Sequence, residues 1–472
     1  MSGYTPELFT AEPGRELLLL PELSLEPEGP LPGRGLLVKD GKFLAVGPAE
    51  SVRAAHPQAK AVDLPGRLVM PGFIDAHQHL GQAFGKGLAW GEPSEIFKRV
   101  WIPLEGFLTE ELIYLSAKLA AFEALRGGFT TVADAGVRSG EDLAVLAQGT
   151  GEVGVRCVLG FICNDFPDSP KPPDQAEILK KADAHLKRFD GAGLVSPSLA
   201  ISIPEIASDY MLNQVYERCR ESGRVFQTHV NEHMVAVERS LVDRKLRPLE
   251  HLVRARALGP ATLAAHATLI TPAEMVMLRD FGAGVAYNPV ASQWKGNAVA
   301  PALALDCLGV RLGLGTDGTR NDGFRLADAA EACQRLAFGL AVADSSCGGG
   351  ARWLSMASAG GAEVLGLGRV TGSIAPGLAA DFLLIDLEAP ELIPSWDLPW
   401  DLLRLGNSSH IEGVFVGGNL RLWQGWPLDW DARALLDRIK ELTAKAVSQA
   451  PIQRIHGTSA EHAVFRKENG LV

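Results

Sequence analysis

The sequence has no run of basic residues and no long apolar segment. Its formal net charge is −11 at pH 7, so a polyanion would be repelled on average, and we expect no nucleic-acid partner. The early apolar run at residues 17–20 stops at Pro21 and is too short for a signal segment or a membrane span. We therefore expect a cytoplasmic protein with no membrane partner.

Close pairs of cysteines are also missing. The six cysteines are scattered along the chain without a CxxC motif. This spacing favours reduced, mostly buried thiols over a disulfide framework or a thiolate metal site.

Length and composition indicate a globular chain with more than one folded unit. Its 472 residues exceed the size at which a single core usually stops growing, so we predict one large and one smaller domain. Both ends carry short apolar runs with glycine turns, including a hairpin signal at Asp40 and Gly41. Residues 372–386 and 411–421 have the same pattern, and 430–450 fits a surface helix. We predict a small β-sandwich domain built from residues 1–69 and 369–472.

The middle of the chain, residues 70–368, alternates short apolar runs with longer amphipathic ones. A good example of the latter is 109–126, where Leu112, Leu115 and Leu119 mark one face and Gly127 follows as a stop. Eight βα units predict a TIM-type (β/α)8 barrel, with a doubly wound parallel sheet as the alternative. The candidate strands are 72–77, 129–134, 155–162, 194–201, 224–229, 262–266, 283–288 and 310–317.

Several predicted strands end in residues that bind metals or move protons. The strand ends of such a barrel meet at one mouth, so residues far apart in sequence become neighbours. Three imidazoles and one carboxylate there would suit a divalent ion and leave a position for water. Taken singly, each residue has an ordinary structural role, and only their occurrence at separate strand ends favours a site. The candidates are His77, His79, His229, His266 and Asp317, with Glu232 just after one strand.

The order of these motifs resembles the amidohydrolase superfamily, in its chlorohydrolase and deaminase branch. The resemblance runs from about residue 36 to about residue 420 and depends on several segments together. They are VMPGFIDAHQHL (69–80), EALRGGFTTVAD (123–134), THVNE (228–232), AAHAT (264–268), YNP (287–289), GLGTDG (313–318) and GSIAPGLAADF (372–382).

The resemblance implies roles for the strand-end residues. It makes Glu232 the proton shuttle, His266 the residue that orients or polarises the attacked group, and Asp317 both a ligand and a proton acceptor. Another branch holds two metals through a carboxylated lysine, but no lysine occurs between Lys187 and Lys245, which argues for one ion. We expect zinc, with Fe²⁺ as the alternative. The implied metal ligands are His77, His79, His229 and Asp317.

The implied reaction is hydrolytic deamination of a nitrogen heterocycle or an amidine-like or guanidine-like small molecule. Hydroxide formed on the metal attacks the ring carbon, and Glu232 protonates the ring nitrogen. A carboxylate that donates a proton needs a raised pKa, so we expect Glu232 in a partly desolvated pocket. Two alternatives stay open: removal of chloride or an alkylamine from a triazine-like ring, and a catalytically silent scaffold.

Four further residues are candidates for substrate binding: Gln82, Lys86, Trp90 and Trp294. Gln82 would pair its amide with a ring carbonyl or ring nitrogen, and a Trp ring would stack on a flat substrate. Trp90 stands where adenosine-derivative deaminases of the family carry acidic residues, which argues against a ribose-bearing substrate. The resemblance also implies a homodimer.

Overall fold

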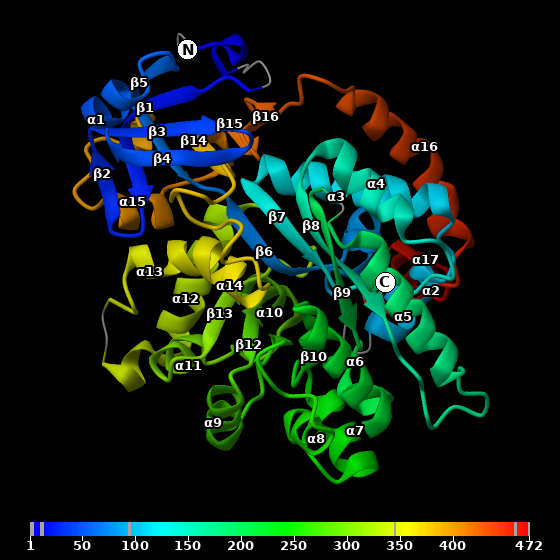
Figure 1. Ribbon diagram of the computed structural model, residues 1–472. Helices are drawn as coiled ribbons and strands as arrows, with labels where there is room; N and C mark the ends of the chain where they lie inside the picture. Colours follow the sequence, from blue (N-terminus) through cyan, green and yellow to red (C-terminus); the bar gives the residue numbers. More distant parts are fainter. Residues whose placement is uncertain are drawn as a thin grey trace.

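The computed structural model describes residues 4–9, 14–92, 96–191, 193–343, 346–456 and 460–470. These residues form two sheets of eight strands each, one parallel and one mixed. The parallel sheet curves around the centre of the molecule with helices outside it, and the mixed sheet packs beside one end (Figure 1).

The parallel sheet is the predicted barrel. All eight candidate strands are present, with bounds within three residues of those predicted, and each pairs in parallel with the next. Hydrogen bonds between the ends of the first and last strands bring them together, because the Asp317 amide donates to the His77 carbonyl at 2.9 Å. The strands are β6 (Phe73–Gln78), β7 (Phe129–Asp134), β8 (Arg156–Ile162), β9 (Val195–Ala200), β10 (Phe226–Val230), β11 (Thr262–His266), β12 (Gly284–Tyr287) and β13 (Arg311–Leu314).

Helices between and after these strands surround the barrel. The predicted helix at 109–126 begins at Glu110 after the cap Thr109, whose hydroxyl accepts from the Leu112 amide. The helices of this layer are α3 (Glu110–Arg126), α4 (Ala144–Val153), α5 (Gln175–Phe189), α6 (Asp209–Ser222), α7 (Met234–Arg244), α8 (Pro248–Arg254), α9 (Pro272–Phe281), α10 (Pro289–Lys295), α11 (Ala302–Cys307), α12 (Gly323–Val342), α13 (Gly350–Ser355) and α14 (Gly361–Val364).

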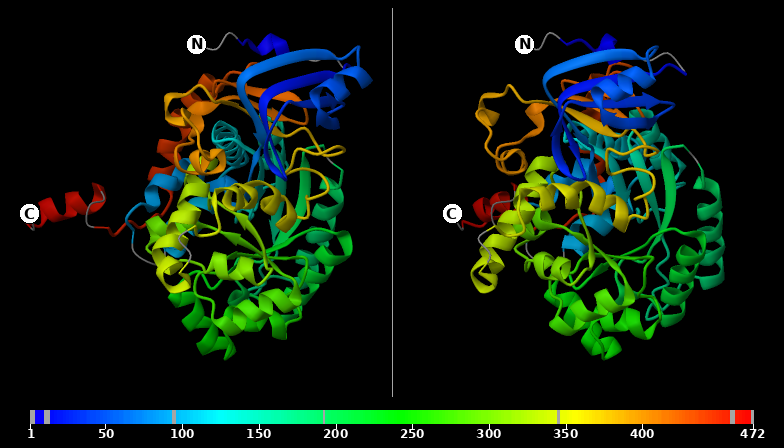
Figure 2. Two further views of the ribbon diagram at one scale, coloured as in Figure 1. Left: turned by 90° about the vertical axis from the view of Figure 1, so that its left-hand side faces the viewer. Right: turned by 60° about the vertical axis from the view of Figure 1, so that its left-hand side comes forward.

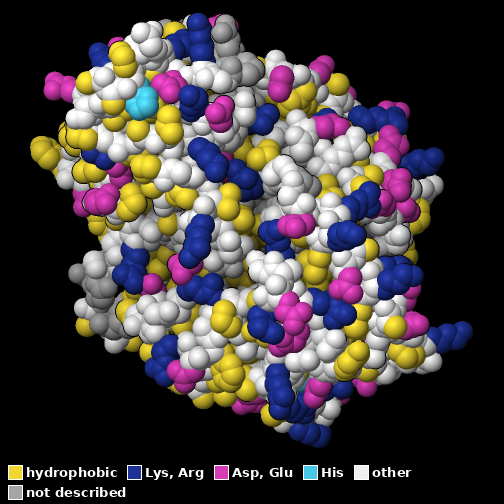
Figure 3. All heavy atoms as spheres, in the orientation of Figure 1, with side chains coloured by type: hydrophobic (Ala, Val, Ile, Leu, Met, Phe, Trp, Pro, Cys, Tyr) yellow, Lys and Arg dark blue, Asp and Glu magenta, His cyan; other side chains and the backbone are white. Residues whose placement is uncertain are grey.

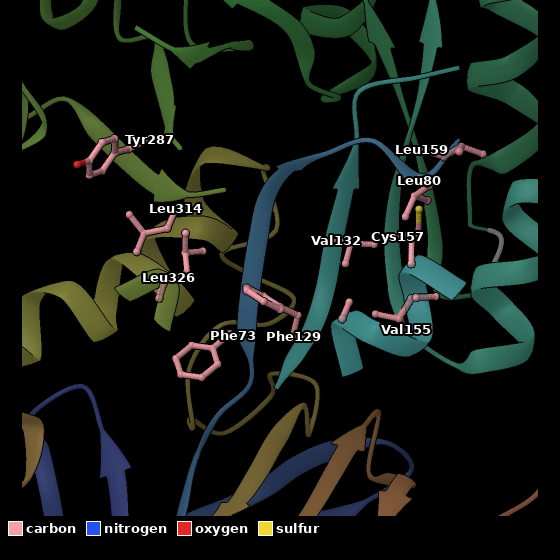
Figure 4. Packing of buried hydrophobic residues seen from close by; sticks show 14 of the residues in the cluster. Phe73, Leu80, Phe129, Val132, Val155, Cys157, Leu159, Tyr287, Leu314 and Leu326 are labelled. Carbon is pink, nitrogen blue, oxygen red and sulfur yellow. The ribbon is translucent and has the colours of Figure 1, made fainter. Parts of the chain in front are cut away.

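The main core lies between the strands and this helical layer. Phe73 of β6 packs edge to face on Phe324 of α12, with ring centroids 4.9 Å apart, and its centroid is 6.0 Å from that of Phe129. Figure 4 shows Phe73 and Phe129 on the first two strands, with Leu314 and Leu326 on neighbouring elements. This packing fixes the strands whose far ends carry the site.

The mixed sheet joins the two ends of the chain. Strand β5 pairs in parallel with β1 and antiparallel with β14, so the N-terminal and C-terminal segments share one sheet. Its core includes Phe382 stacked on Phe415 at 4.2 Å between centroids. The strands are β1 (Leu17–Glu26), β2 (Gly29–Pro32), β3 (Arg34–Lys39), β4 (Lys42–Pro48), β5 (Lys60–Pro71), β14 (Phe382–Asp386), β15 (Ile411–Val416) and β16 (Asn419–Trp423).

The predicted hairpin joins β3 to β4. Asp40 and Gly41 have φ angles of 48° and 78°, the left-handed conformations that a tight two-residue hairpin turn needs. The prediction was less accurate at 372–386, where only Phe382–Asp386 forms a strand. The preceding residues turn repeatedly, with Gly372 and Gly377 at φ 98° and 89°.

The remaining helices are α1 (Ala49–Ala55), α2 (Ile102–Glu105), α15 (Leu398–Arg404), α16 (Ala432–Gln449) and α17 (Ala460–Glu468). Helix α16 confirms the predicted terminal surface helix, and α17 stands out from the body of the protein (Figure 2). Strand β5 ends at Pro71 and β6 begins at Phe73, while the domain bounds at 69/70 and 368/369 stay predictions.

The cysteines agree with the expectation from their spacing. All six cysteines are free thiols and five of them are buried. On the face seen in Figure 3, acidic and basic side chains are interspersed. None of the helices in the described part of the chain combines the length and apolarity needed to cross a bilayer.

Candidate metal centre and active-site cavity

The barrel brings the predicted imidazoles and the aspartate together at the carboxyl ends of its strands. Asp317 Oδ1 lies 3.2 Å from His79 Nε2 and 3.5 Å from His77 Nε2. The Nε2 atoms of His79 and His229 are 3.3 Å apart. These side chains come from the ends of β6, β10 and β13, yet their ligating atoms point to one place.

The compact cluster differs from the predicted ligand set in one member. The four residues that offer ligand atoms all within 4.8 Å of one another are His77, His229, His266 and Asp317. This set contains His266 in place of His79, although His79 Nε2 also approaches Asp317 and His229 closely. Five side chains are therefore candidates for the ligand set of one ion.

The donor atoms suit a metal ion. Within the described residues, buried His77 Nδ1 and Nε2 have no hydrogen-bond partner, and such atoms are costly without one. Burial lowers the pKa of His79, and it lowers that of His229 far more, while the pKa of His266 falls to about 3. These imidazoles are neutral at pH 7, which is the form that binds metals.

Backbone and side-chain bonds hold these residues in place. Asp75 accepts from the Thr316 amide at 2.9 Å and from its hydroxyl at 2.5 Å, which ties the first strand to the turn before Asp317. His266 and Asp317 have φ angles of 71° and 55°, which are rare for residues with side chains. Strained backbone of this kind is concentrated at functional sites.

Sequence reasoning missed Lys295, the last residue of α10. Its Nζ donates to Glu232 Oε1 and to Asp317 Oδ2, at 2.6 Å each. The side chain is 10% exposed, so this is a buried cation between two buried carboxylates. One signal could have found it, because Lys295 follows the YNP motif in the loop after β12, and strand-end loops carry the functional residues of such barrels.

Lys295 also overturns the expectation for Glu232. That residue is buried as predicted, and burial alone would raise its pKa. His266, Lys295 and His233 outweigh burial and hold the pKa well below its usual value. Glu232 is therefore ionised in the folded chain, because a cationic neighbour absent from the prediction stabilises the charged form.

The predicted substrate residues fall into two groups. Gln82 and Trp294 line the cavity beside His79, Glu232 and Lys295. Lys86 instead pairs with Glu123 at 2.5 Å and lines a separate cleft. Trp90 is 41% exposed and meets the Trp294 ring edge to face, 5.0 Å between centroids, without lining the cavity.

A polar network forms one wall of the same cavity. Gln82 Nε2 donates to Glu105 Oε1 at 2.5 Å, and Arg138 Nη1 donates to both oxygens of Glu105 at 2.9 and 3.0 Å. The Arg138 guanidinium also lies 4.5 Å from the centre of the Phe97 ring. The Gln82 amide nitrogen is thus bound to protein, and the wall is shaped before any substrate arrives.

Comparison with known proteins identifies the family. The model of the amidohydrolase family matches residues 68–421, more than half of the chain, and that of a bacterial imidazolonepropionase-like composite domain matches residues 35–59. The chain belongs to the amidohydrolase family, as the resemblance predicted, and is a hydrolase acting on carbon–nitrogen bonds.

Individual relatives lie at moderate identity. A 5-methylthioadenosine/S-adenosylhomocysteine deaminase of Syntrophobacter fumaroxidans is 28% identical over 422 residues, which cover 89% of this chain and 95% of the relative. An adenosine deaminase from Xanthomonas campestris, solved with bound zinc, has a TM-score of 0.83 at 24% identity and covers 93% of this chain and 100% of its own. An atrazine chlorohydrolase from Arthrobacter aurescens, complexed with zinc, has a TM-score of 0.80 at 19% identity, covering 90% and 99%. The two solved structures show that the fold is shared.

Proposed function

We propose that this protein is a deaminase that releases ammonia from a nitrogen heterocycle or an amidine-like small molecule with the help of one divalent ion, zinc in the first instance. The observation that carries the proposal is the convergence of imidazoles and Asp317 on one point beside the buried carboxylate Glu232. The relatives that share most of the chain's length are named as deaminases, which supports the same reaction. A homodimer and a cytoplasmic location remain predictions.

The hydrogen-bond pattern favours His229 over His266 as a metal ligand. His229 Nδ1 donates to the Ser202 carbonyl at 2.7 Å, which leaves the lone pair of Nε2 for an ion. Asn288 Nδ2 donates to His266 Nδ1 at 3.2 Å, so the proton of His266 lies on Nε2. The His266 Nε2–H is then a donor toward a substrate or Glu232. We accordingly assign the ligands as His77, His79, His229 and Asp317.

The chain's own residues move and hold protons next to that ion. A bound zinc ion lowers the pKa of its water to about 7 and so supplies a nucleophile at neutral pH. Glu232 starts ionised, so it would take a proton from the attacking water and pass it to the ring nitrogen. His266 Nε2 lies 3.6 Å from Glu232 Oε2 and faces the same reacting group. Lys295 occupies Asp317 Oδ2, which leaves Oδ1 to face the imidazoles.

The test is metal analysis combined with an ammonia-release assay. Zinc-loaded protein is offered 5′-methylthioadenosine, 5′-deoxyadenosine, adenine, guanine, cytosine, pterin and melamine, with atrazine as the triazine bearing chloride. We expect one bound ion per chain and ammonia from at least one of these amines. The Glu232→Gln variant should lose the activity, and Glu238→Gln, an exposed carboxylate on α7, should keep it.

Other outcomes separate the alternatives. Chloride or alkylamine released from atrazine without ammonia from any amine would replace deamination by triazine hydrolysis. If wild-type protein binds no more metal than a His79→Ala variant does, the result would favour a catalytically silent scaffold.

A further inference from the structure

A second buried carboxylate, Glu205, faces the same cavity and plays no part in the proposed reaction. It lies in the short turn Pro204–Ile206 that follows β9. Its side chain is 1% exposed, and the residue lines the cavity together with His229 and Glu232. The Arg244 side chain holds this turn in place, because its Nη2 donates to the backbone carbonyl of Glu205 at 2.9 Å.

The Glu205 carboxylate lacks the partners that buried carboxylates normally have. Neither of its oxygens has a hydrogen-bond partner among the described residues, and the nearest cation, Arg239 Nη1, is 4.0 Å away. Burial raises the pKa of Glu205 to about 7, against the opposing effects of its own backbone N–H and of the more distant Arg239 and Arg244. Burying such a group without donors costs stability, so its position needs another explanation.

A structural carboxylate in the same protein shows the contrast. Glu331 of α12 is fully buried and accepts from Arg335 Nε at 2.7 Å and from Arg404. Its charge is neutralised by these contacts, whereas that of Glu205 is not. An acceptor held without a protein donor at the wall of a substrate cavity has the arrangement expected of a recognition group.

The rest of the cavity offers complementary donors. Arg138 and Trp294 also line it, and their buried Nε and Nε1 atoms have no hydrogen-bond partner among the described residues. The residues of the wall therefore hold one acceptor group and two donors that no hydrogen bond to a described residue satisfies. A flat polar molecule with acceptor atoms on one edge and a donor elsewhere would satisfy all three.

We propose that Glu205 determines specificity by accepting a hydrogen bond from an N–H or O–H group of the substrate that is distinct from the amine released. This inference rests on the proposed function, since it concerns the substrate of the same cavity. It narrows the substrate class to heterocycles that carry such a second donor, either on the ring or on an attached sugar.

The test uses pairs of compounds that share the reacting amine and differ only in the other donor groups they carry. Adenosine is compared with 2′,3′-dideoxyadenosine, and 2,6-diaminopurine with adenine. Dissociation constants by calorimetry and kcat/KM for ammonia release are measured for zinc-loaded wild type, Glu205→Gln and Glu205→Leu. The matched control is Glu331→Gln, which changes a partnered buried carboxylate.

In at least one pair, we expect wild type to bind the donor-bearing compound about 10- to 100-fold more tightly. This is the ratio of dissociation constants that one hydrogen bond to a charged group produces. Glu205→Leu should abolish that preference while leaving affinity for the donor-lacking compound unchanged. It should also raise the melting temperature, because it removes an unpartnered buried charge, whereas Glu331→Gln should lower it.

The outcomes distinguish the two proposals. Wild type that shows no preference in either pair, or a Glu205→Leu variant that keeps the preference, overturns the role of Glu205. Loss of affinity for both members of a pair assigns Glu205 a purely structural role and also overturns it. If binding depends on Glu205 but no compound releases ammonia, the result contradicts the proposed deamination. The role of Glu205 in recognition would still stand.

Discussion

Replacing Lys295 by Met should destabilise the protein, and by much more when the metal is removed. Lys295 Nζ lies 2.6 Å from a carboxylate oxygen of Glu232 and of Asp317, whose side chains are 11% and 5% exposed. Breaking a buried ion pair from one side typically costs about 3–5 kcal/mol, and here one substitution leaves two carboxylates without their cation. In metal-free protein we therefore expect a loss near the top of that range, about 5 kcal/mol.

A bound zinc ion would compensate Asp317, so the loss in the loaded protein should fall to about half of that value. The assay is urea unfolding of wild type and Lys295→Met, each with saturating zinc and with a chelator. Lys180→Met, at a lysine whose side chain is 79% exposed, is the control and should change little. A double variant with Asp317→Asn measures how strongly the two residues are coupled.

Two results would refute this reasoning. A loss below about 1 kcal/mol in the chelated protein would mean that the ion pairs contribute no more than surface pairs do. An equal loss with and without zinc would mean that Lys295 and the metal do not act on the same carboxylates.

Three further predictions follow from the same geometry. Glu232→Gln should lower kcat by about 100- to 10,000-fold with little change in KM, measured by ammonia release, since a proton-transfer group is removed but the cavity is kept. Thr316→Val should lower the free energy of unfolding by about 1–3 kcal/mol in urea titrations, because buried Asp75 loses its hydroxyl donor; an unchanged midpoint would contradict this. Because the pKa of Glu205 is raised in the folded state, its contribution to stability should be lost as pH rises from about 4.5 to about 7. Glu205→Leu should thus stabilise the protein more at pH 8 than at pH 4 in thermal melts, and a pH-independent difference would contradict this.

The barrel could be predicted from the sequence because its signals are local. Each strand is a short apolar run bounded by turns or helix caps, and parallel strands buried on both faces are recognisable in this way. The segment 372–381 was harder, because Gly372 and Gly377 adopt φ angles that interrupt a run otherwise typical of strands. The pattern of apolar residues does not indicate where such turns occur.

The site was predictable only where residues lie at strand ends. His77, His229 and Asp317 follow from that rule together with the family motifs. Lys295 follows from it less directly, because it lies at the end of α10, beyond the end of β12, and its two carboxylate partners come from segments after other strands. Lys86 and Trp90 lie only a few residues beyond His79, but the short helical segment Leu80–Ala89 directs Lys86 toward Glu123. Proximity in sequence to a ligand was therefore a poor guide to proximity in space.

The bond between Asp75 and Thr316 joins positions 241 residues apart in the chain. During synthesis, a nascent chain that has emerged through β12 already contains every histidine of the centre but lacks its aspartate. The full set of ligands exists only after the eighth strand has been made and has docked beside the first. Full-length chains that bind the ion tightly must therefore have closed the barrel. Chains truncated before β13 should bind metal weakly, even though they contain every histidine of the centre.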